Sequence, residues 1–153
     1  MKNKTRNRKF RNKSHCWLTS DLIESDAFLN LSGKAAMLCL IRFHQKAYKK
    51  NVKPKRGGAN QQLITNNGEI IFTYAEAKEL GIKSSQTFYR VIRELVEEKG
   101  FIDIAESGNW YEKEPTRFAI SFRWTRYGKS DYEKVEIPRM LPKGLGFKKQ
   151  KPL

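Results

Sequence analysis

The 153-residue chain has only two cysteines and two histidines, no long apolar run, and no acidic residue near either end. Two cysteines cannot form a dense disulfide framework, so a reduced cytosolic chain is the simpler interpretation. A zinc site would have to be assembled from His15, Cys16, Cys39 and His44, and their spacing matches no known ligand pattern. We therefore expect a core Cys39, surface histidines and no metal.

The lack of a long apolar stretch argues against a membrane protein. A transmembrane helix needs about 20 apolar residues, and the basic start is not followed by the apolar segment of a secretory signal. The basic ends also lack the apolar face or lipidation site of a stable anchor. We expect no membrane partner.

Enzyme signatures are scarce too. The chain has no Gly-rich phosphate loop and no nucleophile elbow. Its acids are scattered over helix faces rather than paired, as a metal-dependent nuclease would need. We expect no enzyme activity, no cofactor and no small-molecule substrate.

What the chain does have is positive charge, concentrated at its ends. There are 31 Lys and Arg against 16 Asp and Glu, a net charge of +15. Residues 1–13 carry seven basic residues and 139–153 carry five, with no acid in either, so the middle is nearly balanced. The pattern predicts a disordered basic tail over 1–13, one folded domain over 14–138, and a basic tail over 139–153. A polyanion is the natural partner of such tails; a solubilising role is the alternative.

The first half of the domain is expected to be helical. "TSDLIESDAF" indicates a short helix, and Ser32 is the expected N-cap of a central buried helix whose segment 35–43 is apolar almost all round. The Pro- and Gly-containing segment 49–58 is typical of an exposed basic loop. An Asn67-Gly68 turn and a short strand over 69–72 follow.

The second half contains a helix pair and a hairpin. Thr73 and Glu76 have capping-box spacing and start a short helix that Gly81 ends. Ser84 is the expected N-cap of a long helix over 85–99, which Gly100 ends. Strand-like segments at 101–104 and 117–124 predict a hairpin with a long polar tip, and Phe118, Ile120, Phe122 and Trp124 alternate onto one face.

This order resembles the winged helix-turn-helix DNA-binding proteins of prokaryotic mobile elements and of plasmid or phage replication modules. The likeness rests on "SDAFLNLSGKAA", "FTYAEAKELGIKSSQTFYRVIRELVEEKGFI" and "PTRFAISF". It implies an α+β fold, a winged helix-turn-helix with an N-terminal helical extension, that binds double-stranded DNA in transcription regulation or DNA replication. It further implies a cytoplasmic, nucleoid-associated protein.

The resemblance also implies which residues contact DNA. The second helix of the pair would enter the major groove, where Arg pairs with guanine and Gln with adenine. The helix start would present N–H groups to a phosphate. The base-contacting residues would be Gln86, Thr87, Tyr89, Arg90 and Arg93. From their charge and place, the expected backbone contacts are Ser84, Ser85, Lys49, Lys50, Lys53, Lys55, Arg56, Lys113, Arg117, Arg6, Arg8, Lys9 and Arg11.

Several alternatives stay open. The outward helix face is an ordinary solvated surface if Arg90 and Arg93 pair with Glu94 and Glu97 at helical spacing. The hairpin tip, which has a net negative charge, either touches DNA through residues such as Asn109 or binds a protein through Trp110 and Tyr111. An RNA-associated protein and a protein-binding winged helix in a larger assembly are alternative functions. Helix-turn-helix proteins often form homodimers, but the sequence shows no heptad to supply an interface.

Overall fold

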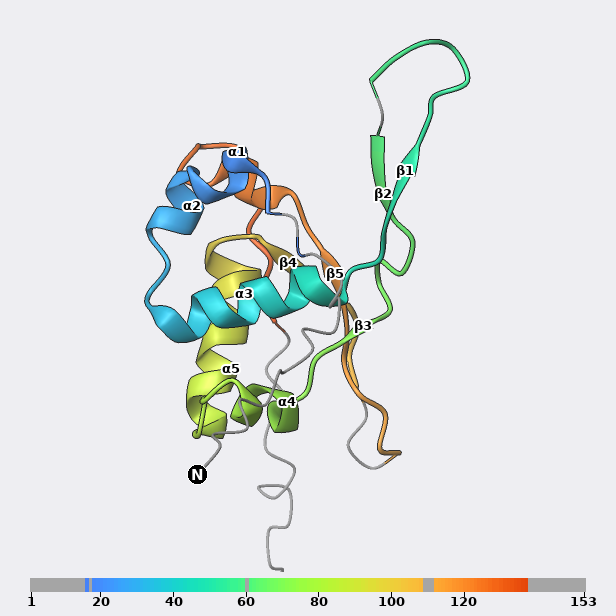
Figure 1. Cartoon of the computed structure of the whole chain (residues 1–153). Coiled ribbons are helices and arrows are strands. Elements are labelled where there is room, and N and C mark those ends of the chain that lie inside the picture. The colour runs from blue at the N-terminus through green and yellow to red at the C-terminus, as the bar shows by residue number, and fades with distance from the viewer. Residues whose placement is uncertain (1–15, 17, 60, 109–111, 138–153) are drawn as a thin grey trace, which may run out of the picture.

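The computed structural model describes residues 16, 18–59, 61–108 and 112–137. Within them the chain is an α+β structure with five α-helices and two small antiparallel sheets, so the predicted class is confirmed. α3 (Lys34–Lys46) crosses the middle of the molecule (Figure 1). Its buried face includes Cys39, Leu40 and Phe43. Phe43 makes edge-to-face contacts, with centroids 5.1 Å apart, to Phe72 and Phe118.

The segment before α3 forms two helices of four residues each rather than one. α1 (Ser20–Ile23) is capped by the Thr19 side chain, and α2 (Asp26–Leu29) by the Ser25 side chain. Ser25 is the residue that divides them, because its hydroxyl accepts from the Phe28 N–H and also donates to the Leu22 carbonyl.

The expected Ser32 N-cap of α3 is wrong. The N-cap is Gly33, which has no side chain to accept a hydrogen bond. Ser32 instead donates its N–H and its hydroxyl to the Glu94 carboxylate, at 2.7 and 2.5 Å. The start of α3 is thus tied to a residue 62 positions later in the chain.

Residues 49–58 are not simply a loop. β1 (Lys49–Val52) pairs antiparallel with β2 (Gln61–Ile64), so only the segment between them is a loop. The hairpin projects from the body beyond the C-terminal end of α3 (Figure 1). We call residues 48–65 the basic arm.

The second sheet has the order β3-β5-β4. β3 (Ile70–Ile71) and β4 (Ile102–Glu106) both pair antiparallel with β5 (Arg117–Ile120). The predicted hairpin is therefore confirmed, but its second strand is shorter than expected. Phe122 is exposed rather than aligned with the core, because η2 (Arg123–Arg126), a 3-10 turn, replaces the strand after Ser121.

Gly100 explains why the chain turns there. Its φ is 71°, and a Cβ at this position would lie 2.7 Å from the Arg123 Cβ. The close approach lets the Trp124 N–H donate to the Gly100 carbonyl at 3.1 Å. A glycine is needed at this site both for its backbone conformation and for space.

The helix pair consists of α4 (Tyr74–Glu79) and α5 (Ser85–Arg93). The Thr73–Glu76 capping box and the Ser84 N-cap are confirmed. Gly81, which was expected to end the short helix, follows the C-cap Leu80 and has a φ of 90°. The α-helix does not reach residue 99, because η1 (Glu94–Glu98) is a π-helical turn in which the Lys99 N–H donates to the Glu94 carbonyl. Three consecutive residues of this turn, Glu94, Leu95 and Val96, are buried.

Candidate nucleic-acid interface

The start of α5 is held rigidly against α4. Phe88 on the inner face of α5 packs edge-to-face on Phe72 at 5.4 Å and also contacts Tyr74. The Tyr74 hydroxyl donates to the Lys83 carbonyl in the connecting turn at 2.7 Å. Tyr74 therefore joins the short helix, the turn and the long helix, and fixes the direction of α5.

The first turns of α5 present a polar outward face. Ser84, Ser85, Gln86 and Arg90 are exposed, Tyr89 is 49% exposed, and Thr87 is half-buried. The Ser84 hydroxyl accepts a hydrogen bond from the Thr87 N–H at 3.3 Å. The backbone N–H groups of Ser85 and Gln86 are therefore the ones placed to bind an anion. The predicted base-contacting residues do share one surface.

Arg90 and Arg93 differ in their partners. The Arg93 guanidinium donates from Nε and Nη2 to one Glu97 oxygen, at 3.1 and 3.0 Å, and this hydrogen bond raises the pKa of Arg93. Arg90 makes no such pair with Glu94, whose side chain is buried and bound to Ser32. The solvated-pair interpretation therefore holds for Arg93 and fails for Arg90.

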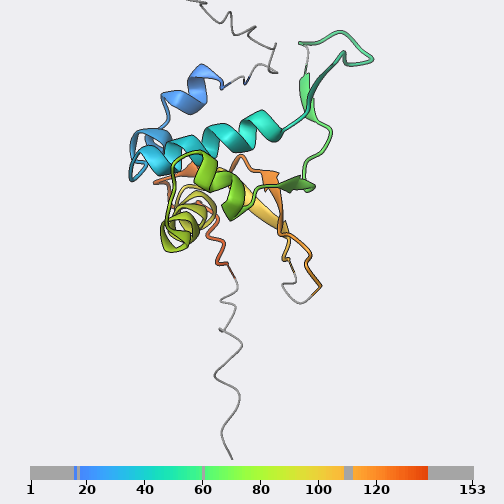
Figure 2. The same ribbon diagram turned by 60° about the horizontal axis from the view of Figure 1, so that its bottom comes forward.

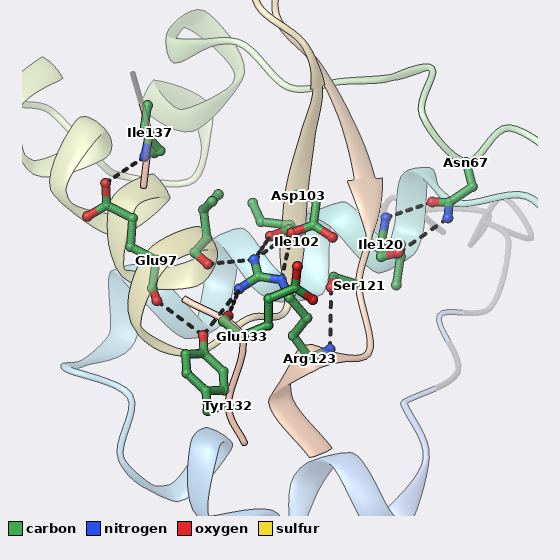
Figure 3. Close-up of polar contacts among 11 residues, drawn as sticks. Asn67, Glu97, Ile102, Asp103, Ile120, Ser121, Arg123, Tyr132, Glu133 and Ile137 are labelled. Carbon is green, nitrogen blue, oxygen red and sulfur yellow. Dashed lines mark hydrogen bonds and ion pairs between the residues drawn. The ribbon is translucent and has the colours of Figure 1, made fainter. Parts of the chain in front are cut away.

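A hydrogen-bonded network holds the C-terminal half of the long helix from behind (Figure 3). Arg123, whose side chain is only 11% exposed, forms an ion pair with Asp103 at 2.5 Å and donates to the Val96 carbonyl at 2.7 Å. It also donates to the Glu133 carbonyl at 3.1 Å. This largely enclosed cation joins η1, β4 and the C-terminal segment 127–137.

Glu97 links the same network to the outward face. Its second carboxylate oxygen accepts from the Ile137 N–H at 2.8 Å, and its backbone carbonyl accepts from the Tyr132 hydroxyl at 3.1 Å. The last described residue of the chain is thereby fixed beside α5 (Figure 3).

The β4–β5 hairpin extends to the same end of the molecule as α4 and the start of α5 (Figures 1 and 2). Lys113 at its tip is exposed with φ 56°, while Arg117 pairs with Glu106 at 3.5 Å. An apolar cleft of about 310 Å³ separates the hairpin from α5 and is lined by residues including Tyr89, Ile92 and Ile137. Asn109, Trp110 and Tyr111 lie outside the described residues, so both interpretations of the tip stay predictions.

The basic arm lies elsewhere. Its root lies near α4, because Lys46 at the end of α3 forms an ion pair with Glu76. From this root the arm projects away from the start of α5 (Figure 1). The structure therefore does not place Lys49, Lys50, Lys53, Lys55 and Arg56 beside the residues that were predicted to contact bases. Arg6, Arg8, Lys9 and Arg11 lie outside the described residues.

Sequence reasoning missed two exposed cations near the start of α5. Lys78 on α4 lies over the Tyr74 ring, 4.7 Å from its centroid, and Lys83 is in the turn that Tyr74 holds. In helix-turn-helix DNA-binding proteins the first helix of the pair crosses the nucleic-acid backbone, so the predicted resemblance could have suggested both lysines. Nothing in the sequence near Arg123 indicates that its side chain is largely enclosed.

His44 was expected at the surface, but it is buried. It is 7% exposed, and neither ring nitrogen has a hydrogen-bond partner among the described residues. Burial, and after it the charge of Lys49, lowers the pKa of His44 to about 4. It faces an 80 Å³ cavity, large enough for water. Cys39 is a core residue as predicted, and burial raises its pKa to about 12.

Two further findings concern the described residues only. Among residues 16, 18–59, 61–108 and 112–137, no three His, Cys, Asp or Glu side chains come close enough together to hold a metal ion. Over the same ranges, none of the helices has the length and apolar character required to span a membrane.

No protein-family model, curated protein or solved structure matches this chain. The geometry of the site and the sequence resemblance therefore carry the functional argument.

Proposed function

We propose that the chain binds double-stranded DNA as a winged helix-turn-helix protein, with α5 in the major groove and the β4–β5 hairpin as the wing. The observation that carries the proposal is the face at the start of α5. It combines a helix N-terminus, exposed Gln86 and Tyr89, and an Arg90 that has no ion-pair partner among the described residues. Arg and Gln are the side chains that pair bidentately with guanine and adenine.

The surroundings of this face support the same function. Lys78 and Lys83 flank the helix start and are suited to contact phosphates. The hairpin extends to the same end of the molecule (Figure 2). The overall charge of +15 favours a polyanionic partner such as DNA.

In this proposal the chain is a DNA-binding protein of transcription or replication rather than an enzyme. The helix 85–93 contacts base edges, while the helix start and the lysines beside it hold the backbone. The basic tails add a salt-sensitive attraction that is blind to sequence.

Competition between B-form DNA and A-form RNA duplexes of matched length tests the proposal, combined with hydrogen-exchange mass spectrometry of the full chain. We expect DNA to compete better and to protect amides over residues 84–90. RNA has a deep, narrow major groove that a helix cannot enter. Better competition by RNA, or no protection over 84–90, would contradict the proposal.

A further inference from the structure

The basic arm is fixed to the body at its root. The Asn66 side chain accepts from the Tyr48 N–H at 2.8 Å and donates to the Lys46 carbonyl at 2.9 Å. The Thr65 N–H donates to the Tyr48 carbonyl at 2.9 Å. These bonds hold both strands at the end of α3, so the arm leaves the body in a defined direction.

The two faces of the arm differ. The register pairs Lys49 with Ile64 and Asn51 with Gln62 on one face, and Ile64 packs against the core. The alternate positions therefore point away from the body. This outer face carries Lys50 and Gln61 together with the exposed apolar side chains Val52 and Leu63.

The charge of the arm has a single sign. Five cations and no acid lie between residues 48 and 65, and Lys53, Lys55 and Arg56 are gathered in the exposed segment between the strands, beside Pro54 and Gly57. Lysines on an exposed strand also discourage edge-to-edge aggregation. Prevention of aggregation does not explain the three further cations in the connecting loop, whereas binding to a polyanion does.

A two-stranded ribbon of this chemistry fits a DNA groove. Strands enter DNA grooves in several protein families, and minor-groove proteins combine Lys, Arg, Asn and Gln with an apolar or proline wedge between base steps. The arm offers basic side chains, Gln61 and Gln62, and the apolar Val52, Leu63 and Pro54. A protein partner would need acidic complementarity to the same cations, and would leave the glutamines without a specific role.

The place of the arm decides which duplex it meets. Its root lies near α4, where Lys46 pairs with Glu76, but its strands project away from the start of α5 (Figure 1). A straight duplex seated on α5 would leave the arm exposed. We propose that the basic arm binds a second DNA duplex, so that one chain bridges two duplex segments; this inference rests on the proposed function for the first.

A two-duplex capture experiment tests the inference with the full chain. One DNA duplex is immobilised and loaded with protein, and recovery of a second, fluorescent duplex is measured at moderate salt. The arm variant is Lys53→Ala/Lys55→Ala/Arg56→Ala. The matched control is Arg126→Ala/Lys129→Ala/Lys134→Ala, which removes three exposed cations from another segment. Thermal melting verifies that both variants are folded.

We expect the arm variant to recover about tenfold less of the second duplex, because three phosphate contacts are lost, and to bind the first duplex nearly as well as the parent. The control should retain bridging. Equal recovery by the arm variant and the parent would overturn the inference, because bridging would then come from the tails or from a dimer. So would a footprint on a single duplex that shortens in the arm variant, since the arm would then wrap the duplex that α5 holds.

The result also separates the two proposals. Arg90→Ala should weaken binding of the first duplex through α5 while the arm still retains DNA. Suppose that Arg90→Ala binds the first duplex as well as the parent does, while the arm variant still recovers less of the second duplex. The proposed function of α5 would then be wrong, and the DNA site on the basic arm would be retained.

Discussion

Arg90 and Arg93 lie about one helical turn apart on α5, yet only one of them is available to a ligand. Arg93 is held by two hydrogen bonds to Glu97, which in turn holds the backbone of Ile137. The partner that helical spacing predicts for Arg90 is Glu94, and Glu94 points inward to Ser32. Because Glu94 is buried against Ser32, the Arg90 guanidinium has no ion-pair partner within the part of the chain that the structure describes.

We predict that Arg90→Ala weakens binding to a specific duplex by about 1–3 kcal/mol and relaxes specificity at one base pair. Arg93→Ala should cost less, because its guanidinium must leave Glu97 before it reaches a base. Fluorescence anisotropy with a fixed duplex measures both. Arg126→Ala, which removes the same charge from η2, is the control. An equal loss of affinity in the control would mean that Arg90 contributes only through its net charge.

His44 makes stability depend on pH. Its pKa is about 4 in the folded chain, against an ordinary value of 6.5, so the unfolded chain binds more protons between these values. The contribution of His44 is complete above pH 6.5 and is lost as the pH falls toward 4. Between pH 7.5 and 5 the loss is on the order of 2 kcal/mol.

Urea unfolding at pH 7.5, 6 and 5 checks this expectation. In His44→Leu, the dependence of the unfolding free energy on pH should be largely removed over that interval. His15→Gln replaces the only other histidine. If His15→Gln removes the dependence and His44→Leu does not, the assignment to the buried ring is wrong.

At the scale of elements, the long-range bond between the start of α3 and η1 is the least expected feature. The Ser32 N–H and hydroxyl each donate to one carboxylate oxygen of Glu94, a residue that is only 5% exposed. Leaving a buried charged group without its partner costs more than a solvent-exposed bond is worth. This bond positions the end of the α5–η1 helix against α3.

We predict that Ser32→Ala and Glu94→Gln each lower the free energy of unfolding by about 1–3 kcal/mol. The two effects should be less than additive in the double variant, because both remove one interaction. Chemical unfolding of the four proteins gives the coupling energy. Glu98→Gln, an exposed acid in the same turn, should stay within about 0.5 kcal/mol of the parent; additive effects of Ser32 and Glu94 would refute the bond.

The elements that the sequence predicted correctly are those with local signals. The Thr73–Glu76 capping box, Gly81 and the Ser84 cap each involve residues within a few positions of one another. The inner side of α5 carries the apolar residues Phe88, Val91 and Ile92, of which Val91 and Ile92 are buried. Of the site, local signals were enough to place the outward face of α5.

The features that were missed depend on contacts distant in sequence. The π-helical turn accommodates three successive buried residues, and its surroundings come from α3, β4 and the C-terminal segment. Arg123 joins groups from three such segments, and an arginine in a sequence is not distinguishable as buried. The arm appeared as a loop because its strands are short and polar, so their pairing left no apolar alternation to detect.

At the scale of the whole molecule, the described residues arrange charge in separate places. The start of α5 and the hairpin lie at one end, and the basic arm lies at the other (Figure 1). The two tails hold most of the excess charge but lie outside the described residues. Binding by the tails alone would depend steeply on salt and would not discriminate between sequences.

The most direct test of base recognition by α5 is selection from a random duplex library at moderate salt with the full chain. We predict an enriched motif that Arg90→Ala loses or relaxes at one position. Two half-sites about one helical turn apart would further indicate a dimer. No enrichment, with binding that disappears as salt rises, would contradict the account and make the outward face of α5 an ordinary solvated surface.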